Sequence, residues 1–149
     1  MLPGGKTLVE LRHAFEHAEQ RISGGMSPRI SPFIEVRDAG ALLQRAGFSL
    51  PVADSEMVDV RYEHPLKLLQ DLRGMGQANA LLHSAKHFMP RRLLRAAMEY
   101  YMQAYSGDDD RVAASFELVT LTAWKPHASQ QQPARRGSGQ ISIAQILKE

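Results

Sequence analysis

The stretch FELVTLTAWKP, from Phe116 to Pro126, constrains the fold most, because it is the longest run of β-branched, aromatic and aliphatic residues in the chain. Its composition predicts a strand over 116–124 that ends at the proline. From Leu118 onward neither face of the strand is strongly polar, which is typical of a strand covered on both sides in an α/β sheet. We therefore expect Trp124, the only tryptophan, to be buried at a strand end, where α/β folds place ligands.

The length and composition fit one domain with its own core, since the chain has 149 residues and is 44% hydrophobic. The absence of cysteine excludes a disulfide framework and a thiolate zinc site. A net charge of +2 is too small to favour nucleic acid as a partner. No apolar run approaches the roughly 20 residues of a membrane span, and residues 1–17 lack the character of a targeting segment. We expect a cytoplasmic protein.

The first predicted helix covers Thr7 to Ile22. Thr7 and Glu10 have the spacing of a capping box, in which the two side chains satisfy backbone N–H groups of the first turn. One apolar stripe repeats at intervals of three and four residues and consists of Leu8, Leu11, Phe15, Ala18 and Ile22. Two prolines in segment 26–33 then disfavour helix and predict an extended loop.

A second helix is predicted over Ile34–Ala46, with Gly47 as its left-handed end. The residues expected to point inward are Val36, Ala39, Leu42, Leu43 and Ala46. The pattern then predicts a short extended piece over 50–53, a turn over Asp54–Glu56 and a strand over Met57–Tyr62. Because one face of this strand is polar, we expect it near the edge of the sheet.

The middle of the chain is predicted to be helical. Pro65 occupies a first-turn position of a third helix that continues to Gly74. A weaker helical piece over Ala78–Lys86 follows, and a stronger helix runs from Pro90 to Tyr105. An acidic turn at 108–110 then returns the chain to the strand at 116–124.

Two regions are predicted: a folded region, 1–127, with a helical cap at about 65–105, and a polar tail, 128–149. The tail is rich in Gly, Pro and Gln and has few groups to bury, so we expect it to be partly disordered. One last turn of helix is predicted over Ala144–Leu147.

His13, Glu16 and His17 have the H-x-x-E-H spacing of an inverted zinc-peptidase motif. Both histidines lie opposite the apolar stripe at 100° per residue, so a solvent-exposed helix face is the main interpretation and a metal site the alternative. A hydrolytic triad has little support, because no acid is paired with His127, Ser129 and Gln130.

Gly74 and Gly76 have two interpretations. Phosphate-binding glycines follow a strand, whereas these follow a helix, so a plain helix break competes with a substrate-facing turn. Arg91, Arg92 and Arg95 form a basic corner at a helix start, which is either solvated or bound to an anionic partner.

Five stretches of the chain resemble the C-terminal part of class I S-adenosylmethionine-dependent methyltransferases. They are GGKTLVELR (4–12), SPRISPF (27–33), VRDAGALLQRAGF (36–48), DLRGMGQAN (71–79) and AWKPHASQQQPARRGS (123–138). The branch that is most similar contains malonyl-acyl-carrier-protein O-methyltransferase and a mitochondrial complex I assembly factor that is assigned arginine hydroxylation. The last stretch is the most specific and resembles the assembly-factor subfamily.

The resemblance implies an α/β fold that is the C-terminal half of a class I methyltransferase (Rossmann-like) fold. Such a half has the last two sheet strands and an inserted helical cap, and no cofactor-binding half. The family binds its cofactor with a glycine-rich turn after the first strand and an acid after the second. We expect no strand here to be followed by such a turn. The strand at 116–124 would lie between the sixth strand and an absent fifth strand, which leaves an open edge.

The same resemblance gives substrate-side candidates, because relatives build a lid over the substrate pocket from the inserted helices. Arg73, Gly76 and Asn79 are the candidates in the lid, since a guanidinium suits a carboxylate or phosphate and an amide both donates and accepts. The candidates for the far wall of the pocket are Trp124, His127 and Gln130. No catalytic residue and no metal ligand is assigned.

Two functions are therefore expected as alternatives. In the first, the chain is part of a methyltransferase or of its hydroxylating relative; it carries the lid, binds no S-adenosylmethionine alone and is inactive alone. In the second, it is a non-catalytic assembly protein that has lost the cofactor half. The expected partners are an N-terminal methyltransferase half, a second copy bound through the 116–124 edge, or a protein substrate. The location is the bacterial cytoplasm, or the mitochondrial matrix if that of the relative applies.

Overall fold

The computed structural model describes residues 1–77, 89–131 and 137–139. In chain order the elements are β1 (Leu2–Pro3), α1 (Val9–Ser23), α2 (Val36–Arg45), β2 (Ser49–Tyr62), α3 (Pro65–Gly74), α4 (Arg91–Tyr105) and β3 (Val112–Trp124). The strands form one antiparallel sheet in the order β1-β3-β2, so the fold is mixed α/β. Asn79 and the helical pieces predicted over 78–86 and 144–147 lie outside the described residues.

β2 and β3 form a long two-stranded ribbon. Its near end is the pair Tyr62–Val112 and its far end the pair Ser49–Trp124, with one register irregularity between Ser49 and Val52. The predicted strand at 116–124 is confirmed and begins four residues earlier, at Val112. The edge position of β2 is also confirmed, because β2 pairs with β3 alone among the described strands.

The turn predicted over Asp54–Glu56 is wrong. Asp54 lies opposite Thr120 and Glu56 opposite Leu118, so β2 is continuous through this segment. Residues 54–56 are all polar, and this predicted a turn from the sequence. In the structure their side chains are exposed. Because β3 offers backbone partners along its whole length, pairing outweighs the low strand preference of these residues.

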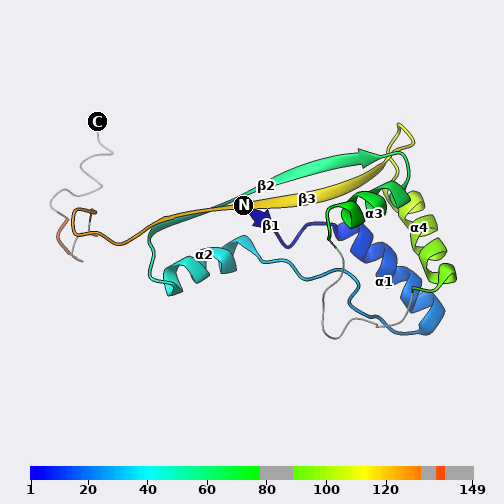
Figure 1. The fold of residues 1–149 in the computed structure, drawn as a ribbon, viewed down its shortest axis with the longest axis horizontal. Coiled ribbons are helices and arrows are strands. Elements are labelled where there is room, and N and C mark those ends of the chain that lie inside the picture. The colour runs from blue at the N-terminus through cyan, green and yellow to red at the C-terminus, as the bar shows by residue number, and fades with distance from the viewer. Residues whose placement is uncertain (78–88, 132–136, 140–149) are drawn as a thin grey trace.

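Helices cover only part of each face of the ribbon. α1, α3 and α4 gather at the near end and α2 lies at the far end (Figure 1). On one face of β3, Val112 is buried, whereas Thr120, Thr122 and Trp124 are exposed. α2 packs on the opposite face, where Gly40 approaches Ala53. Trp124 is 49% exposed, so its predicted burial is wrong: no described helix covers its face at the far end.

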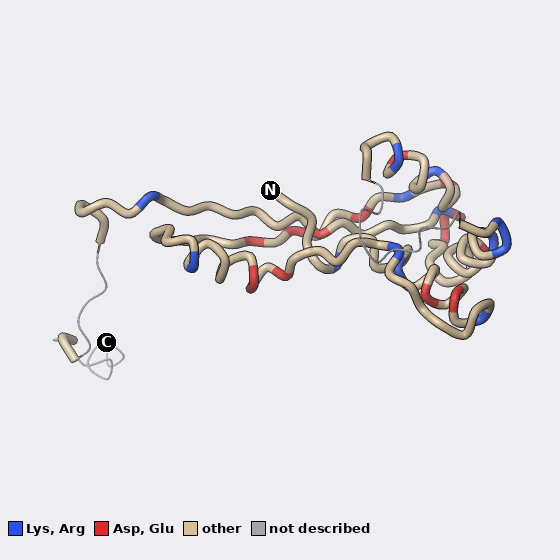
Figure 2. The backbone as a smooth tube through the Cα atoms, turned by 60° about the horizontal axis from the view of Figure 1, so that its bottom comes forward, with Lys and Arg blue, Asp and Glu red and all other residues tan. Residues whose placement is uncertain are grey.

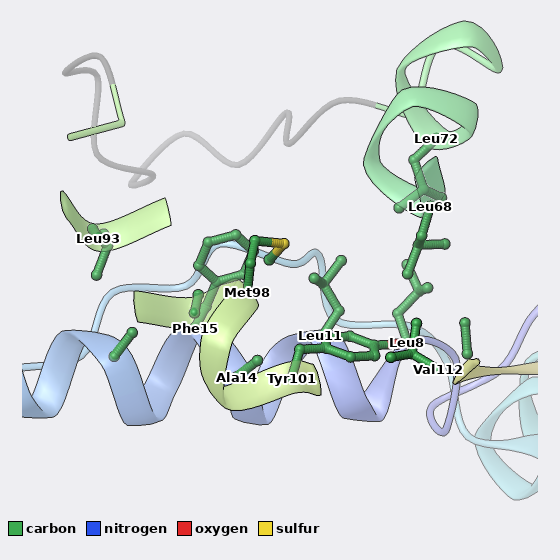
Figure 3. Close-up of a cluster of buried hydrophobic side chains, with 13 residues drawn as sticks. Leu8, Leu11, Ala14, Phe15, Leu68, Leu72, Leu93, Met98, Tyr101 and Val112 are labelled. Atoms are coloured by element: carbon green, nitrogen blue, oxygen red, sulfur yellow. The ribbon is translucent and has the colours of Figure 1, made fainter. Parts of the chain in front are cut away.

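The core lies at the near end, between α1, α3, α4 and the start of β3 (Figure 3). Its buried members are Leu8, Leu11, Ala14, Phe15, Ala18, Leu68, Leu72, Leu93, Ala97, Met98, Tyr101, Val112 and Ala114. The Tyr101 hydroxyl donates to the Ala113 carbonyl at 2.7 Å, which joins α4 to β3. Burial raises the pKa of Tyr101 well above its usual range. This side chain is therefore neutral in the folded protein.

α1 is confirmed, but its capping box is wrong. The helix begins after Leu8, a left-handed residue, and no side chain caps it. Thr7 instead exchanges hydrogen bonds with the Glu117 backbone, and the Glu10 carboxylate accepts from the Ser115 N–H at 3.1 Å. Partners on β3 thus outcompete the local box. Four stripe residues are buried as predicted, whereas Ile22 is 37% exposed.

α2 ends as predicted. Gly47 is left-handed, with φ of 79°, and the Phe48 N–H donates to the Leu43 carbonyl. Of the five residues expected to point inward, however, Leu42 and Ala46 are exposed and only Ala39 is buried. The large apolar residues exposed at this end, called here the far-end apolar residues, are Leu42, Phe48, Leu50, Val52 and Trp124.

In the described residues, no helix is long and apolar enough to cross a membrane.

Candidate substrate-side site

The predicted substrate-side residues lie at two ends of the molecule. Arg73 and Gly76 lie at the end of α3, which packs at the near end, and Trp124 ends β3. The 13 residues of β3 span roughly 40 Å at about 3.3 Å per residue. The structure therefore does not bring the lid candidates and the far-wall candidates together. Asn79 lies outside the described residues.

The glycines after α3 form a helix end. Gly76 has φ of 73° and its N–H donates to the Arg73 carbonyl at 3.0 Å, while the Gln77 N–H donates to the Leu72 carbonyl at 2.9 Å. This pair of hydrogen bonds is the Schellman arrangement. Gly74 is the last residue of the helix itself. The glycines therefore end the helix, as the helix-break interpretation expects.

His127 and Gln130 are engaged in a turn of their own after β3. His127 Nδ1 lies 2.8 Å from Ser129 Oγ, and the His127 N–H donates to Gln130 Oε1 at 3.0 Å. Gln130 Nε2 donates to the Lys125 carbonyl at 3.1 Å. The two side chains thus serve the turn, and no acid takes part in it.

The H-x-x-E-H motif joins α1 to α4. His13 Nδ1 lies 3.1 Å from the Tyr105 hydroxyl, and the His17 ring stacks on Tyr100 with centroids 3.9 Å apart. His13 is exposed as predicted, whereas His17 is half-buried against the tyrosine. The described part of the chain contains no group of three or more His, Cys, Asp or Glu residues that could hold a metal ion.

A small pocket lies where two of the stretches that resemble the family meet, the end of GGKTLVELR and SPRISPF. It has a volume of about 110 Å³ and lies between α1 and residues 27–30. Arg12, Glu16 and Arg29 supply its charged groups and Phe15 an apolar wall. Arg12 Nη2 is buried without a hydrogen-bond partner in the part of the chain that the structure describes. A buried donor without a partner costs about 1–3 kcal/mol, so this pocket is the best candidate for a bound acceptor.

Glu19 fixes the segment that closes this pocket. Its carboxylate accepts from the Ser27 N–H and hydroxyl, both at 2.6 Å, and from Arg29 Nε at 2.5 Å. Burial raises the pKa of Glu19, but the hydrogen bonds from Ser27 and the charge of Arg29 outweigh burial and hold it below the usual range. Glu19 is therefore ionised at neutral pH, and it holds Arg29 beside Arg12.

The pocket can bind one small anionic group. A guanidinium presents several N–H donors in a fixed fork that matches a carboxylate or a phosphate. A volume of about 110 Å³ is well below the roughly 300 Å³ at which whole small-molecule sites begin. The pocket therefore suits a group at the end of a substrate.

The turn at Gly4 and Gly5 is a candidate for binding the cofactor of the family, because it follows a strand. β1 is followed by Gly4 and Gly5 and then by α1, so the position of the two glycines matches that of a cofactor turn, whereas their surroundings do not. The space beside Gly4 holds the Glu117 carboxylate, 2.6 Å from where a Cβ would lie, and the space beside Gly5 holds Glu35. The Lys6 N–H already donates to Glu117 Oε2 at 2.9 Å. This turn does not fit S-adenosylmethionine, because its glycines are already packed against the two carboxylates.

Known proteins that resemble the chain match it over most of its length. The mitochondrial arginine hydroxylase NDUFAF5 of Danio rerio is 40% identical over 145 residues, which are 97% of this chain and 45% of the relative. The same protein of Homo sapiens is 39% identical over 145 residues, 97% of this chain and 42% of the relative. The malonyl-[acyl-carrier protein] O-methyltransferase of Nitrosospira multiformis is 30% identical over 123 residues, 83% of this chain and 38% of the relative. The predicted resemblance is confirmed for both branches.

The chain spans less than half of the length of these relatives. No protein-family model matches it. The similarity to NDUFAF5 includes nearly the whole chain, and that to the O-methyltransferase is shorter and weaker.

Proposed function

We propose that this chain is the substrate-side part of a methyltransferase-like protein, of the O-methyltransferase or the complex I assembly type. In this proposal the chain supplies the lid and the anion pocket, a separate unit supplies the S-adenosylmethionine site, and the chain alone is inactive. The relatives' names support both types, as arginine hydroxylase and as O-methyltransferase.

The observation that carries the proposal is the unequal pairing of the two edges of β3. One edge pairs with β2 from Val112 to Trp124, whereas β1 pairs with the other edge only at Leu118 and Val119. Beyond Val119, residues 120–124 have no strand partner on that edge in the described structure. An open edge on a central strand fits the implication of the family resemblance that a further strand pairs there.

The far-end apolar residues support the same proposal. All five are between 45% and 55% exposed, and they lie at the end of the ribbon where the open edge lies. Covering them with a second unit would stabilise the assembly, since full burial of one large apolar side chain is worth about 1.5–3 kcal/mol.

The pocket at Arg12 and Arg29 supports an anionic group on the substrate. Arg29 is already paired with Glu19, so the Arg12 guanidinium, with Nη2 unpartnered in the described structure, is the group that favours a carboxylate over a cationic side chain. Malonate should therefore bind the chain more tightly than free arginine does. Malonate binding that Arg12→Gln abolishes and the exposed Arg37→Gln leaves intact would support this role, and tighter binding of arginine would contradict it.

A fusion protein tests the proposal. The part of the Nitrosospira multiformis relative that precedes the region of similarity is joined in frame to this chain, and S-adenosylmethionine is titrated calorimetrically into the fusion and into each part alone. The fusion should bind with a Kd below about 100 μM, roughly −5.5 kcal/mol, and this chain alone should not. Equal binding by the chain alone would refute the proposal.

A second candidate function is a non-catalytic assembly protein, which the exposure of the far-end apolar residues also favours. In that case the fusion binds no cofactor, while the chain alone forms a defined complex with a protein partner. We propose the cytoplasm as the location if the protein is bacterial, and the mitochondrion if the location of NDUFAF5 applies to it.

A further inference from the structure

A second, larger hollow lies between α1 and α4, with a volume of about 300 Å³. Arg21 reaches it from α1, and Arg92 and Arg95 reach it from α4. Arg21 lies nine residues after Arg12, which places the two about 180° apart around α1 at 3.6 residues per turn. The hollow is therefore on the opposite side of α1 from the pocket at Arg12.

Close packing of the two helices brings these arginines together. The side chains of α1 and α4 that are almost completely buried in the shared cluster include the small residues Ala14, Ala18 and Ala97. Small residues let two helices approach closely. Long side chains from both helices can then extend into the same hollow.

The hollow has an excess of positive charge. Its one acidic lining residue in the described structure is Glu99, which lies 3.4 Å from Arg95 in an exposed pair of the kind that contributes little. Within the described residues, Arg21 and Arg92 take part in no ion pair. Figure 2 shows acidic and basic residues together at the helical end, so the excess of positive charge is local to the lining of the hollow.

We propose that this hollow binds the phosphate group of a small phosphate-bearing molecule. Guanidinium groups bind phosphate oxygens in pairs, and three exposed arginines from two helices line this one hollow. α4 begins at Arg91, beside the hollow, and no side chain caps its N-terminus. This N-terminus is the positive end of the helix dipole. Ile22 and Ala96 form an apolar floor for the organic part of the ligand, and a volume of about 300 Å³ is the lower end of small-molecule sites.

Calorimetric titration of the whole chain with pyrophosphate at constant ionic strength tests the proposal. Pyrophosphate should bind with a Kd below about 1 mM. The double variant Arg21→Gln/Arg92→Gln should bind at least tenfold more weakly. The control is Arg37→Gln/Arg45→Gln on α2, which removes the same charge from exposed positions elsewhere, and it should bind as the unaltered chain does. Equal weakening in both doubles, or no binding by the unaltered chain, would overturn the proposal.

A variant with the opposite expected effect separates binding from misfolding. Glu99→Gln removes the acid that faces the hollow, so pyrophosphate should bind several-fold more tightly, and unchanged or weaker binding would count against the site. Titration with inorganic phosphate and with glycerol phosphate separates the possible ligands: tighter binding of the ester supports an organic phosphate, and tighter binding of the free ion overturns the role of the apolar floor. None of these titrations needs the cofactor unit, so their outcome is independent of the proposed function.

Discussion

The buried Glu19 forms an ion pair with the partly buried Arg29, with Oε1 and Nε 2.5 Å apart, and this pair holds the loop after α1 against the helix. The Glu19 side chain is 5% exposed and also accepts both hydrogen bonds that Ser27 offers it. One carboxylate therefore positions the whole loop side of the anion pocket.

Glu19→Gln should destabilise the protein by about 1–3 kcal/mol, because donors of Ser27 and Arg29 lose a charged acceptor in a buried place. The matched control is Glu16→Gln, which removes a carboxylate of the same helix that is only half-buried. Urea unfolding measures both. Equal shifts of the two midpoints would contradict the role of Glu19.

The stability that Glu19 supplies should depend on pH. Its pKa is lowered in the folded state, so the contribution is fully present above the ordinary pKa of about 4.3 and is lost as pH falls through the folded value. Thermal unfolding of the unaltered chain and of Glu19→Gln, from pH 7 down to pH 3, should give midpoints that converge toward the acid end. A difference between the two unfolding midpoints that stays constant with pH would mean that the charge of Glu19 does not contribute to stability.

Trp124→Ala should change the free energy of unfolding by less than about 1 kcal/mol, since the indole is half exposed at the far end. Leu68→Ala in the core is the comparison; Leu68 is completely buried and its loss should cost about 2–5 kcal/mol. A large effect at Trp124 in the isolated chain would show that its face is covered.

Gly4→Ala should destabilise the chain by about 1–3 kcal/mol, because its Cβ would lie 2.6 Å from the buried Glu117 carboxylate. Gly25→Ala is the control, since a Cβ there meets no atom within 4 Å and the backbone is not left-handed. The two variants should differ clearly in urea midpoint, and similar midpoints would mean that Glu117 moves aside without cost.

Helices and the main strand could be predicted because their apolar spacing is a local property. α1, α2, α3, α4 and β3 all lie where the pattern placed them. The errors come from partners far away in sequence: β3 extends β2 through Asp54–Glu56, and it takes Thr7 away from the capping box. The secondary-structure preference of a short segment carries no information about a partner strand that is distant in sequence.

The site was harder to predict than the fold. Glu19 follows Ala18 and lies four residues after Phe15, so it falls on the apolar stripe, and an acid in that position signals a buried pair. Glu117 shares a strand face with Val119 and Leu121 and is likewise buried, with its carboxylate accepting from the Lys6 N–H. The exposure of Trp124 had no such signal, because a strand pattern shows that a face is apolar and does not show which element covers it.

Pairing of the open edge of β3 in solution is the most direct test of the proposed function. The N–H and C=O of Glu117 face the β1 side, so by alternation those of Ala123 face the open edge, and Ala123→Pro removes an edge donor without removing a bond to β2. Light scattering across a concentration series should show that the mass of the unaltered chain rises with concentration, whereas Ala123→Pro stays monomeric to higher concentration. A monodisperse monomer at every concentration, with or without Ala123→Pro, would contradict an edge that is open for a second unit.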